Sequence, residues 1–391
     1  MKIAILTCGI LPIPAVQGGA VENMIDFYLD YNDRKKIHDI TVYSPFAPGV
    51  DSNPALTSSV NHYIYIDVSS LWARARRWLY GRLHKDEYYN HFIEYYFEQI
   101  FADLSRKHFD LIVLENSPGH VYKLSQRGFH NIALHLNNDL LNSQSRHHDA
   151  IFNGLTRIIT CSDYIRRRVC TIRHDGKVQT LYNAIDVGSF VAATPARRSE
   201  MSLSDDDFVI VYSGRVNKDK GVAELIDAML LLRDIPRLKL MIIGGTFYGN
   251  AGDEDPFVRT LKEKAMSIKD RIVFTGFVPY AQVPACLHTA DIAVLPSMWE
   301  EPFGLTIVEA MAAGLPLVTT RSGGIPEICE GVATIVEKEN VAEGLAAAIR
   351  DLYRQPEKRR QMCDAARQRA WHFDKEAYAR DFLTALSACQ P

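Results

Sequence analysis

The sequence lacks any apolar run long enough to span a membrane, and it has no pair of cysteines at a CxxC spacing. A transmembrane helix needs about 20 consecutive apolar residues, and the opening apolar stretch, residues 2–7, is also too short for a secretory signal. The seven cysteines are scattered, which argues against a disulfide framework or a zinc site. These absences predict a cytoplasmic protein with reduced thiols.

An excess of positive charge is missing as well. The chain has 44 Lys and Arg residues against 47 Asp and Glu residues, a net charge of -3, which argues against nucleic acid as an obligate partner. The length of 391 residues and the hydrophobic content of 47% are typical of a globular protein with two domains.

Short apolar runs alternate with helix-compatible stretches along the whole chain. In the first half these runs are residues 2–7, 40–43, 63–66, 110–114, 131–135, 157–161 and 178–182, and in the second half they are residues 208–213, 239–244, 271–276, 291–296, 315–320 and 332–336. Such alternation predicts parallel sheets covered by helices on both faces. We therefore predict an α/β protein with Rossmann-like domains at residues 1–185 and 208–370, a polar linker at 186–207 and a C-terminal helix within 371–391.

The segment from Glu301 to Glu309 carries the most functional information. It follows an apolar run that reads as a buried strand, so Glu301 is expected in a loop and Glu309 about one turn inside the next helix. Main-chain N–H groups at the start of that helix, at Phe303, Gly304 and Leu305, lack internal partners and favour an anion such as phosphate. Carboxylates repel phosphate but accept strong hydrogen bonds from hydroxyls. The segment therefore predicts a ligand that carries both phosphates and hydroxyls.

Two cations stand five residues apart after the first strand of the second half. Arg215 follows Gly214, and Lys220 precedes Gly221. Arginine and lysine converging beside glycines are suited to a departing diphosphate, although a solvated basic loop is an equally simple interpretation of this segment alone.

Three further positions lie in the first half of the chain. Gly18 and Gly19 open a helix and let the main chain approach a phosphate or sugar. His135 ends a predicted strand, where a parallel sheet presents residues to a ligand. A glycine pair is otherwise a turn, and a lone histidine is usually structural.

Taken in order, these motifs resemble the large retaining glycosyltransferase group 1 family (family 4), which has the GT-B fold of two Rossmann-like domains facing a central cleft. The acid, seven residues, acid pattern and the Arg-x4-Lys-Gly segment match that family, and the resemblance runs from residue 2 to about residue 373. It also includes residues 271–279, the glycine turn at residues 242–245 and the Gly-Gly-x-Pro-Glu segment at residues 323–327.

The resemblance implies a role for each position. Arg215 and Lys220 neutralise the leaving nucleotide diphosphate, Glu301 holds a donor sugar hydroxyl, and Glu309 holds the ribose. His135 orients the donor sugar, the main chain at Val278 contacts the base, and other donor contacts are implied at Gly18, Gly19, Gly214, Gly245, Phe303, Gly304 and Leu305. The C-terminal helix is expected to cross back to the N-terminal domain, which binds the acceptor.

The expected activity is hexosyl transfer with retention, from a UDP-sugar in preference to a GDP-sugar, to a glycan, glycolipid or small-molecule acceptor in polysaccharide biosynthesis. No metal or other cofactor is expected, because cations and helix N-termini can neutralise the leaving group. The segment Asp253-Glu-Asp255 has a metal-binding form but lies in a polar loop. Two alternatives remain open: a nucleotide-sugar epimerase of the same fold and a non-catalytic carbohydrate-binding protein.

Residues 72–85 combine two Trp and several basic side chains in the first domain. The simpler interpretation is a helix that packs its Trp side chains and exposes its Arg side chains to water. The alternative is a peripheral contact with the inner membrane face or with a phosphate-bearing acceptor.

Overall fold

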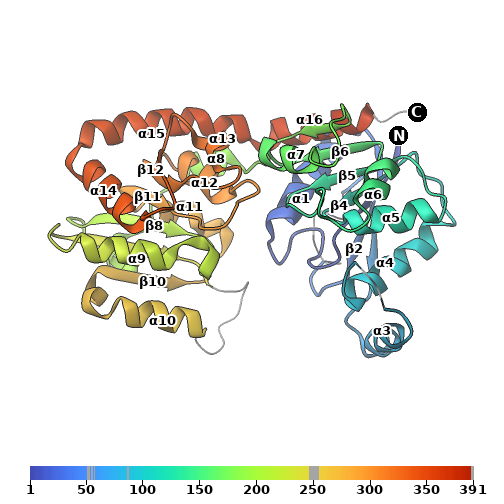
Figure 1. The fold of residues 1–391 in the computed structure, drawn as a ribbon, viewed down its shortest axis with the longest axis horizontal. Coiled ribbons are helices and arrows are strands. Elements are labelled where there is room, and N and C mark those ends of the chain that lie inside the picture. Colours follow the sequence, from blue (N-terminus) through green and yellow to red (C-terminus); the bar gives the residue numbers. More distant parts are fainter. Residues whose placement is uncertain (51–52, 54–55, 57, 86–87, 246–254, 389–391) are drawn as a thin grey trace. The chain divides into compact units, whose positions relative to one another are not determined.

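The chain folds into two α/β units in the computed structural model, which describes all residues except 51–52, 54–55, 57, 86–87, 246–254 and 389–391. One unit comprises Met1–Asn183 together with the C-terminal segment from Lys375, and the other comprises Ala184–Asp374. Figure 1 shows each unit as a sheet with helices against it. The prediction of two parallel-sheet α/β domains is confirmed.

The first unit contains a seven-stranded parallel sheet in the order β3-β2-β1-β4-β5-β6-β7. Its strands are β1 (Lys2–Leu6), β2 (Asp39–Pro45), β3 (His62–Ile66), β4 (Leu111–Glu115), β5 (Ile132–Leu136), β6 (Arg157–Thr160) and β7 (Val178–Thr180). Its described helices include α1 (Ala20–Lys35), α3 (Leu71–Leu83), α4 (His91–Leu104), α5 (Pro118–Gln126), α6 (His148–Gly154), α7 (Asp163–Val169) and α16 (Lys375–Ser387). Strands β1, β4 and β5 are almost completely buried, which accounts for their continuous apolar sequence.

The second unit contains a six-stranded parallel sheet in the order β10-β9-β8-β11-β12-β13. Its strands are β8 (Phe208–Ser213), β9 (Leu238–Ile243), β10 (Ile272–Gly276), β11 (Ile292–Leu295), β12 (Leu317–Thr320) and β13 (Thr334–Val336). Its α-helices are α8 (Val187–Val191), α9 (Val222–Leu231), α10 (Pro256–Lys264), α11 (Val283–Leu287), α12 (Leu305–Ala312), α13 (Ile325–Cys329), α14 (Val341–Arg354) and α15 (Pro356–Ala370). Short 3-10 turns are η1 (Arg198–Met201), η2 (Lys218–Lys220), η3 (Met266–Arg271), η4 (Tyr280–Gln282) and η5 (Trp371–Phe373).

The C-terminal helix α16 belongs to the first unit, although it follows the second unit in sequence. The Tyr28 and Phe382 rings stack with their centroids 4.3 Å apart, which joins α16 to α1. At the surface, Arg34 pairs with Glu376 at 2.6 Å. Helix α16, which comes from the C-terminal end of the sequence, therefore packs on the core of the first unit.

Residues 186–207, which we expected from their polar composition to be a linker, contain α8 and η1 and lie within the second unit. Phe190 and Leu203 are buried, and the main-chain oxygen of Phe190 lies 2.7 Å from Nε2 of His288. The buried side chains of Phe190 and Leu203 thus attach this polar segment to the rest of the second unit.

Candidate functional site

The predicted donor residues of the second unit lie around the carboxyl ends of its parallel strands. The order of the sheet reverses between β8 and β11, because later strands are added on opposite sides of this pair. Ligands of open α/β sheets bind at such a point, outside the carboxyl ends of the strands. The loop after β8 carries Arg215, and the loop after β11 carries Glu301.

Arg215 is held by its main chain and extends its guanidinium to solvent. The Tyr212 hydroxyl donates to the main-chain oxygen of Arg215 at 2.7 Å, and Arg215 itself is exposed. Within the part of the chain that the structure describes, no acidic side chain forms an ion pair with it. Its positive charge is therefore positioned by the loop and remains accessible to an anion.

Lys220 and Glu301 form an ion pair between the two loops at the reversal point. The Ser297 hydroxyl donates a second hydrogen bond to Glu301 at 3.1 Å. The Lys220 ammonium also lies 5.2 Å from the centroid of the Trp299 ring, in the range of a cation–π contact. Because both charged side chains are largely buried, their attraction is screened less than that of a surface pair.

Close main-chain approach holds these loops together. A Cβ atom on Gly221 would lie 1.8 Å from the main-chain oxygen of Pro296, and one on Gly244 would lie 2.0 Å from that of Gly214. Both glycines also have φ in the left-handed region, at +71° and +132°. Only glycine fits at these positions without displacing the main chain.

Gly245, a predicted donor contact, joins the loops that follow β8 and β9. Its main-chain oxygen accepts a hydrogen bond from the N–H of Val216 at 3.0 Å. The chain directly beyond it, residues 246–254, lies outside the described residues and includes Asp253 of the predicted acidic loop. The described member, Asp255, accepts the N–H of Phe257 at 2.7 Å and so caps α10.

Helix α12 begins immediately after Gly304, whose φ of +110° redirects the chain into the helix. Phe303 is buried, and its ring meets that of Phe373 edge to face with centroids 5.6 Å apart. The first N–H groups of α12, at Leu305 and Thr306, have no main-chain oxygen within the helix to accept their hydrogen bonds. The helix start lies directly downstream of Glu301, as the sequence predicted, and offers N–H donors to an anion.

Glu309 lies on the second turn of α12 and is buried. Burial raises its pKa from the usual 4.5 to about 7, against the lowering effect of a hydrogen bond from Tyr280. Tyr280 stands two residues after Val278, at the start of η4. The structure thus brings Glu309 to the segment whose main chain we expected to contact the base.

Glu300 differs from its neighbour Glu301 in its surroundings. Its carboxylate accepts the N–H of Gly323 at 2.6 Å and pairs with Lys338 at 2.6 Å, and the Lys338 hydrogen bond lowers its pKa. In the next residue, the main-chain oxygen of Glu301 accepts the N–H of Gly324 at 2.7 Å. The loops after β11 and β12 are therefore joined by hydrogen bonds at both Glu300 and Glu301.

Gly18 and Gly19 precede α1 in the first unit, and both have φ in the left-handed region. A Cβ atom on Gly19 would lie 2.1 Å from Oε2 of Glu22, whereas the space around Gly18 is open. Glu22 is buried, and burial raises its pKa. The glycine loop therefore packs against its own helix at Gly19 and leaves Gly18 accessible.

His135 lies near the end of β5 in the first unit. Its imidazole is fully buried inside β5, where Nδ1 lies 2.8 Å from Oε2 of Glu115. The Tyr28 hydroxyl donates to the other carboxylate oxygen at 3.1 Å, and the Phe382 ring lies 5.1 Å from the imidazole centroid. The other imidazole nitrogen, Nε2, is buried without a hydrogen-bond partner among the described residues, so the expected contact of His135 with a donor sugar stays a prediction.

Asn137 is the polar residue at the end of β5 that the sequence analysis missed. Its side-chain oxygen and nitrogen are both buried without a hydrogen-bond partner among the described residues, while its main-chain N–H donates to Oδ1 of Asn116 at 2.7 Å. A buried amide without partners is costly, so such a group marks a position suited to a polar ligand. The polar run that directly follows the apolar strand was the available signal.

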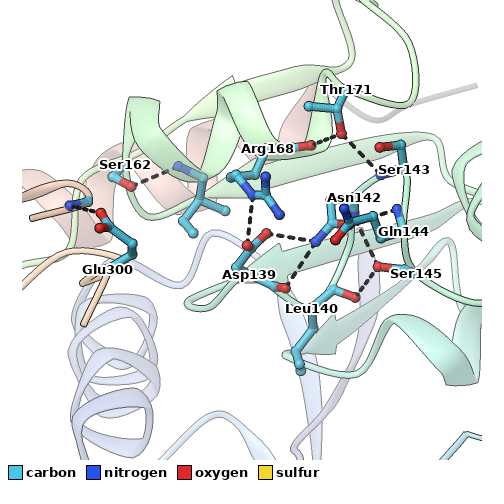
Figure 2. A network of polar contacts seen from close by, with 12 residues as sticks. Asp139, Leu140, Asn142, Ser143, Gln144, Ser145, Ser162, Arg168, Thr171 and Glu300 are labelled. Atoms are coloured by element: carbon cyan, nitrogen blue, oxygen red, sulfur yellow. Dashed lines mark hydrogen bonds and ion pairs between the residues drawn. The ribbon is translucent and has the colours of Figure 1, made fainter. Parts of the chain in front are cut away.

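A polar network fixes the loop that follows β5 (Figure 2). Arg168 of α7 donates to Asp139 at 2.7 Å, and the Asn142 amide donates to the same carboxylate at 3.0 Å. The main-chain oxygen of Arg168 accepts the Thr171 hydroxyl at 2.6 Å, and that hydroxyl accepts the Ser143 N–H at 3.0 Å. This network anchors the loop after β5 to α7.

Among the described residues, no group of three or more His, Cys, Asp or Glu side chains is arranged to hold a metal ion. The structure likewise contains, in its described portion, no helix that combines the length and hydropathy needed to cross a membrane.

Comparison with known proteins identifies the class of the second unit. Residues 194–369 match the family model described as glycosyl transferases group 1. Residues 194–369 therefore carry the domain of that family, in agreement with the resemblance seen in the sequence motifs.

Two curated relatives align with most of the chain. A putative glycosyltransferase, YtcC, of Bacillus subtilis (strain 168) is 28% identical over 366 residues, which are 89% of this chain and 82% of the relative. Spore coat protein SA of the same organism is 26% identical over 388 residues, with 95% and 94% of the two chains covered.

Solved structures share the fold. Anabaena Alr3699/HepE in complex with UDP-glucose has a TM-score of 0.74 at 21% identity, covering 99% of this chain and 100% of that one. Sucrose-phosphate synthase from Thermosynechococcus elongatus has a TM-score of 0.75 at 19% identity, with 99% and 98% covered. The fold is therefore that of the GT-B glycosyltransferases, as predicted.

Proposed function

We propose that this glycosyltransferase moves a hexose from a nucleotide diphosphate sugar to an acceptor hydroxyl, with retention at the anomeric carbon. The observation that carries the proposal is the grouping of an accessible Arg215, the Lys220–Glu301 pair and the N-terminal N–H groups of α12 at the sheet reversal. Cations and oriented N–H groups stabilise a departing diphosphate, and a carboxylate among them accepts hydrogen bonds from a sugar.

In the proposed reaction, the bond between the anomeric carbon and the diphosphate oxygen breaks as Arg215, Lys220 and the first N–H groups of α12 stabilise the negative charge. The acceptor hydroxyl forms the new glycosidic bond on the face from which the diphosphate departs. Its proton passes to the leaving phosphate oxygen. No side chain in this scheme forms a covalent intermediate, and no metal ion is required.

Lys220 and Glu301 contact different parts of the donor in this proposal. We propose that the donor inserts between them, with its phosphate on the ammonium and a sugar hydroxyl on the carboxylate. The hydrogen bond from Ser297 keeps the Glu301 carboxylate oriented when the Lys220 ammonium contacts the donor phosphate instead. Glu309 receives the ribose hydroxyls, and the main chain of Val278 receives the base. The contact between Tyr280 and Glu309 supports this assignment, because it joins the expected base and ribose positions.

The first unit supplies the acceptor side of the proposal. We assign a direct polar contact at the end of β5 to Asn137, because its amide lacks a partner among the described residues. His135 holds Glu115 through Nδ1, and its Nε2, which also lacks such a partner, is assigned to the donor sugar. Gly18 leaves room for a phosphate or sugar to approach the main chain.

The donor is proposed to be a UDP-sugar in preference to a GDP-sugar, and the acceptor a glycan, glycolipid or small molecule of a cytoplasmic polysaccharide pathway. The preference for UDP is supported by the shared fold with Alr3699/HepE, which was solved in complex with UDP and with UDP-glucose.

Thermal stabilisation by UDP, GDP, ADP and their hexose conjugates tests the proposal, with the Arg215→Ala/Lys220→Ala double variant measured alongside. A ligand at a hundred times its dissociation constant adds about 2.7 kcal/mol to the free energy of unfolding. We expect a shift with one nucleotide base that the double variant abolishes. Stabilisation by sugars alone would instead support the carbohydrate-binding alternative.

Product analysis separates the transferase from the epimerase. Incubation with the stabilising nucleotide sugar alone should leave the sugar unchanged apart from slow hydrolysis. Interconversion of sugars without an acceptor would contradict hexosyl transfer and identify an epimerase.

A further inference from the structure

Helix α3 of the first unit presents its large apolar side chains to solvent. Leu71, Trp72, Trp78, Leu79 and Leu83 are exposed by 81%, 82%, 60%, 53% and 71%. Such side chains normally face the core of a soluble domain, and contiguous exposed apolar surface marks an interaction site. The amphipathic pattern of α3 is thus reversed relative to an ordinary surface helix.

Helical geometry places these side chains on one face. At about 100° per residue, Leu71, Trp72, Ala75, Trp78, Leu79 and Leu83 fall within an arc of about 140°. The opposite face packs on α4: Ala73 is buried, the Tyr80 and Tyr95 rings meet with centroids 6.1 Å apart, and the Arg77 guanidinium lies 4.6 Å from the Phe92 centroid. In Figure 1, α3 lies beyond α4 in the first unit. The apolar face therefore points away from the fold.

Positive charge lies on both sides of this apolar face, at Arg74 and Arg76, and within it at Arg82. Residues 71–85 contain Arg74, Arg76, Arg77, Arg82 and Lys85 and no acidic residue. Arg74 and Arg76 are exposed and form no ion pair with any residue that the structure describes. The Arg82 guanidinium lies over the Trp78 ring at 4.5 Å, which keeps a cation beside an exposed indole.

We propose that α3 binds the surface of an anionic phospholipid bilayer, lying in the plane of the interface. Trp72, Trp78 and the exposed leucines enter the boundary between headgroups and acyl chains, and the arginines contact lipid phosphates. Interfacial helices combine such apolar and basic groups, and tryptophan favours this depth. The proposal concerns attachment of the protein and is independent of its catalytic activity.

Charge argues against a second copy of the chain as the occupant. In a symmetric dimer the same surface meets itself, so Arg74, Arg76 and Arg82 of one copy would approach those of the other. Like charges brought together in an interface are unfavourable. An anionic bilayer neutralises the same arginines, each of which adds to the attraction.

Vesicle co-sedimentation of the full chain tests the proposal. We expect binding to vesicles of phosphatidylcholine that contain roughly 30 mol% of the anionic lipid phosphatidylglycerol. Binding to vesicles of phosphatidylcholine alone should be much weaker. The Arg74→Gln/Arg76→Gln variant should bind the anionic vesicles roughly 25-fold more weakly, about fivefold for each arginine neutralised. The matched control is Arg259→Gln/Lys269→Gln, which removes two exposed positive charges from the second unit and should bind like the wild type.

A second variant separates insertion from simple charge attraction. Trp72→Ser/Leu79→Ser keeps every arginine and replaces side chains that make few contacts in the fold, so its melting temperature should not change while its vesicle binding falls. Equal binding by both variants and the wild type, or no preference for anionic vesicles, would overturn the proposal. A dimer in solution that Trp72→Ser/Leu79→Ser converts to monomer, without vesicle binding, would overturn it in favour of self-association.

Discussion

The ammonium of Lys220 is paired with the carboxylate of Glu301 and lies over the Trp299 ring, at 5.2 Å from its centroid. The two residues are 81 positions apart in the chain and meet because β8 and β11 are neighbours in the sheet. This pair joins the cation proposed for the diphosphate to the carboxylate proposed for the sugar.

Arg215→Ala and Lys220→Ala should both reduce turnover by about 100-fold or more, since each removes a charge that stabilises the leaving group. They should differ in stability. Arg215 is exposed, so its loss should leave the melting temperature unchanged. Loss of Lys220 leaves Glu301 largely buried without its cation and should cost about 1–3 kcal/mol.

Steady-state kinetics and thermal melts of the two variants check this pair of outcomes. The Lys220→Ala/Glu301→Ala double variant is the control for the ion pair, because it should recover part of the stability and none of the turnover. Near-normal turnover of either single variant would remove that residue from the proposed site.

Glu309 should make stability depend on pH. Its folded pKa of about 7 lies above its usual 4.5, so the folded state holds the proton more tightly than the unfolded state. The free energy of unfolding should therefore be highest below pH 4.5, fall as pH rises through 7, and then level off. The total change is at most about 3 kcal/mol.

The Glu309→Gln variant isolates this contribution in urea unfolding curves measured from pH 5 to 8. A comparison with the wild type is needed because burial also raises the pKa of Asp26, in the first unit, to about 7. If the ribose binds the ionised carboxylate, UDP-glucose affinity should rise about tenfold from pH 6 to 8 in the wild type and stay flat in Glu309→Gln. A flat wild-type profile would contradict the proposed ribose contact.

Gly244→Ala should destabilise the second unit by about 3 kcal/mol, because the new Cβ would meet the Gly214 main-chain oxygen at 2.0 Å in addition to the strain of its left-handed φ. Gly276→Ala is the matched control. Gly276 also has a left-handed φ, at +70°, but the space around it is open. It should cost only about 1 kcal/mol.

Chemical denaturation of both glycine variants measures the difference. Equal losses would show that φ strain alone accounts for the requirement for glycine at position 244, and that the approach of the loops after β8 and β9 is not tight.

Substitutions at His135 and Asn137 should separate structural support from ligand contact. His135→Ala leaves the buried Glu115 without its imidazole partner and should cost about 3–5 kcal/mol. Asn137→Ala removes a buried amide that has no partner among the described residues, so stability should stay the same or rise while the KM for the donor or acceptor rises.

Melting curves and KM values for both substrates decide this prediction. Asn137→Asp is the conservative control, since it keeps the shape and one hydrogen-bonding oxygen. An unchanged KM for both substrates in Asn137→Ala would exclude the proposed contact of Asn137, and an unchanged KM for the donor in His135→Ala would exclude the predicted donor contact of His135.

Much of this fold was predictable from local sequence. The apolar runs that became β1, β4, β5, β8, β9 and β11 are buried on both faces, and such strands must be continuously hydrophobic. Local spacing also predicted that Gly304 stands at the start of a helix with Glu309 inside it. These features depend on neighbouring residues, which the sequence lists in order.

Residue type alone did not reveal burial or partners. His135 resembles a ligand residue in the sequence, yet its imidazole is enclosed by Glu115 from β4 and Phe382 from α16. Asn137 is unremarkable in the sequence, and only the structure shows that its amide is buried without a partner among the described residues. For α3, the sequence analysis favoured packed Trp side chains, whereas the structure exposes them.

The sequence by itself determined the α/β class, the motifs of the glycosyltransferase family and the charged residues that the proposed chemistry requires, because these depend on periodicity and spacing along the chain. Tertiary structure decided that Lys220 meets Glu301, that Tyr280 meets Glu309 and that the apolar face of α3 points to solvent. The physical reason is that burial and pairing depend on which strands and helices become neighbours in space, and the order of a parallel sheet differs from the order of its strands in the chain.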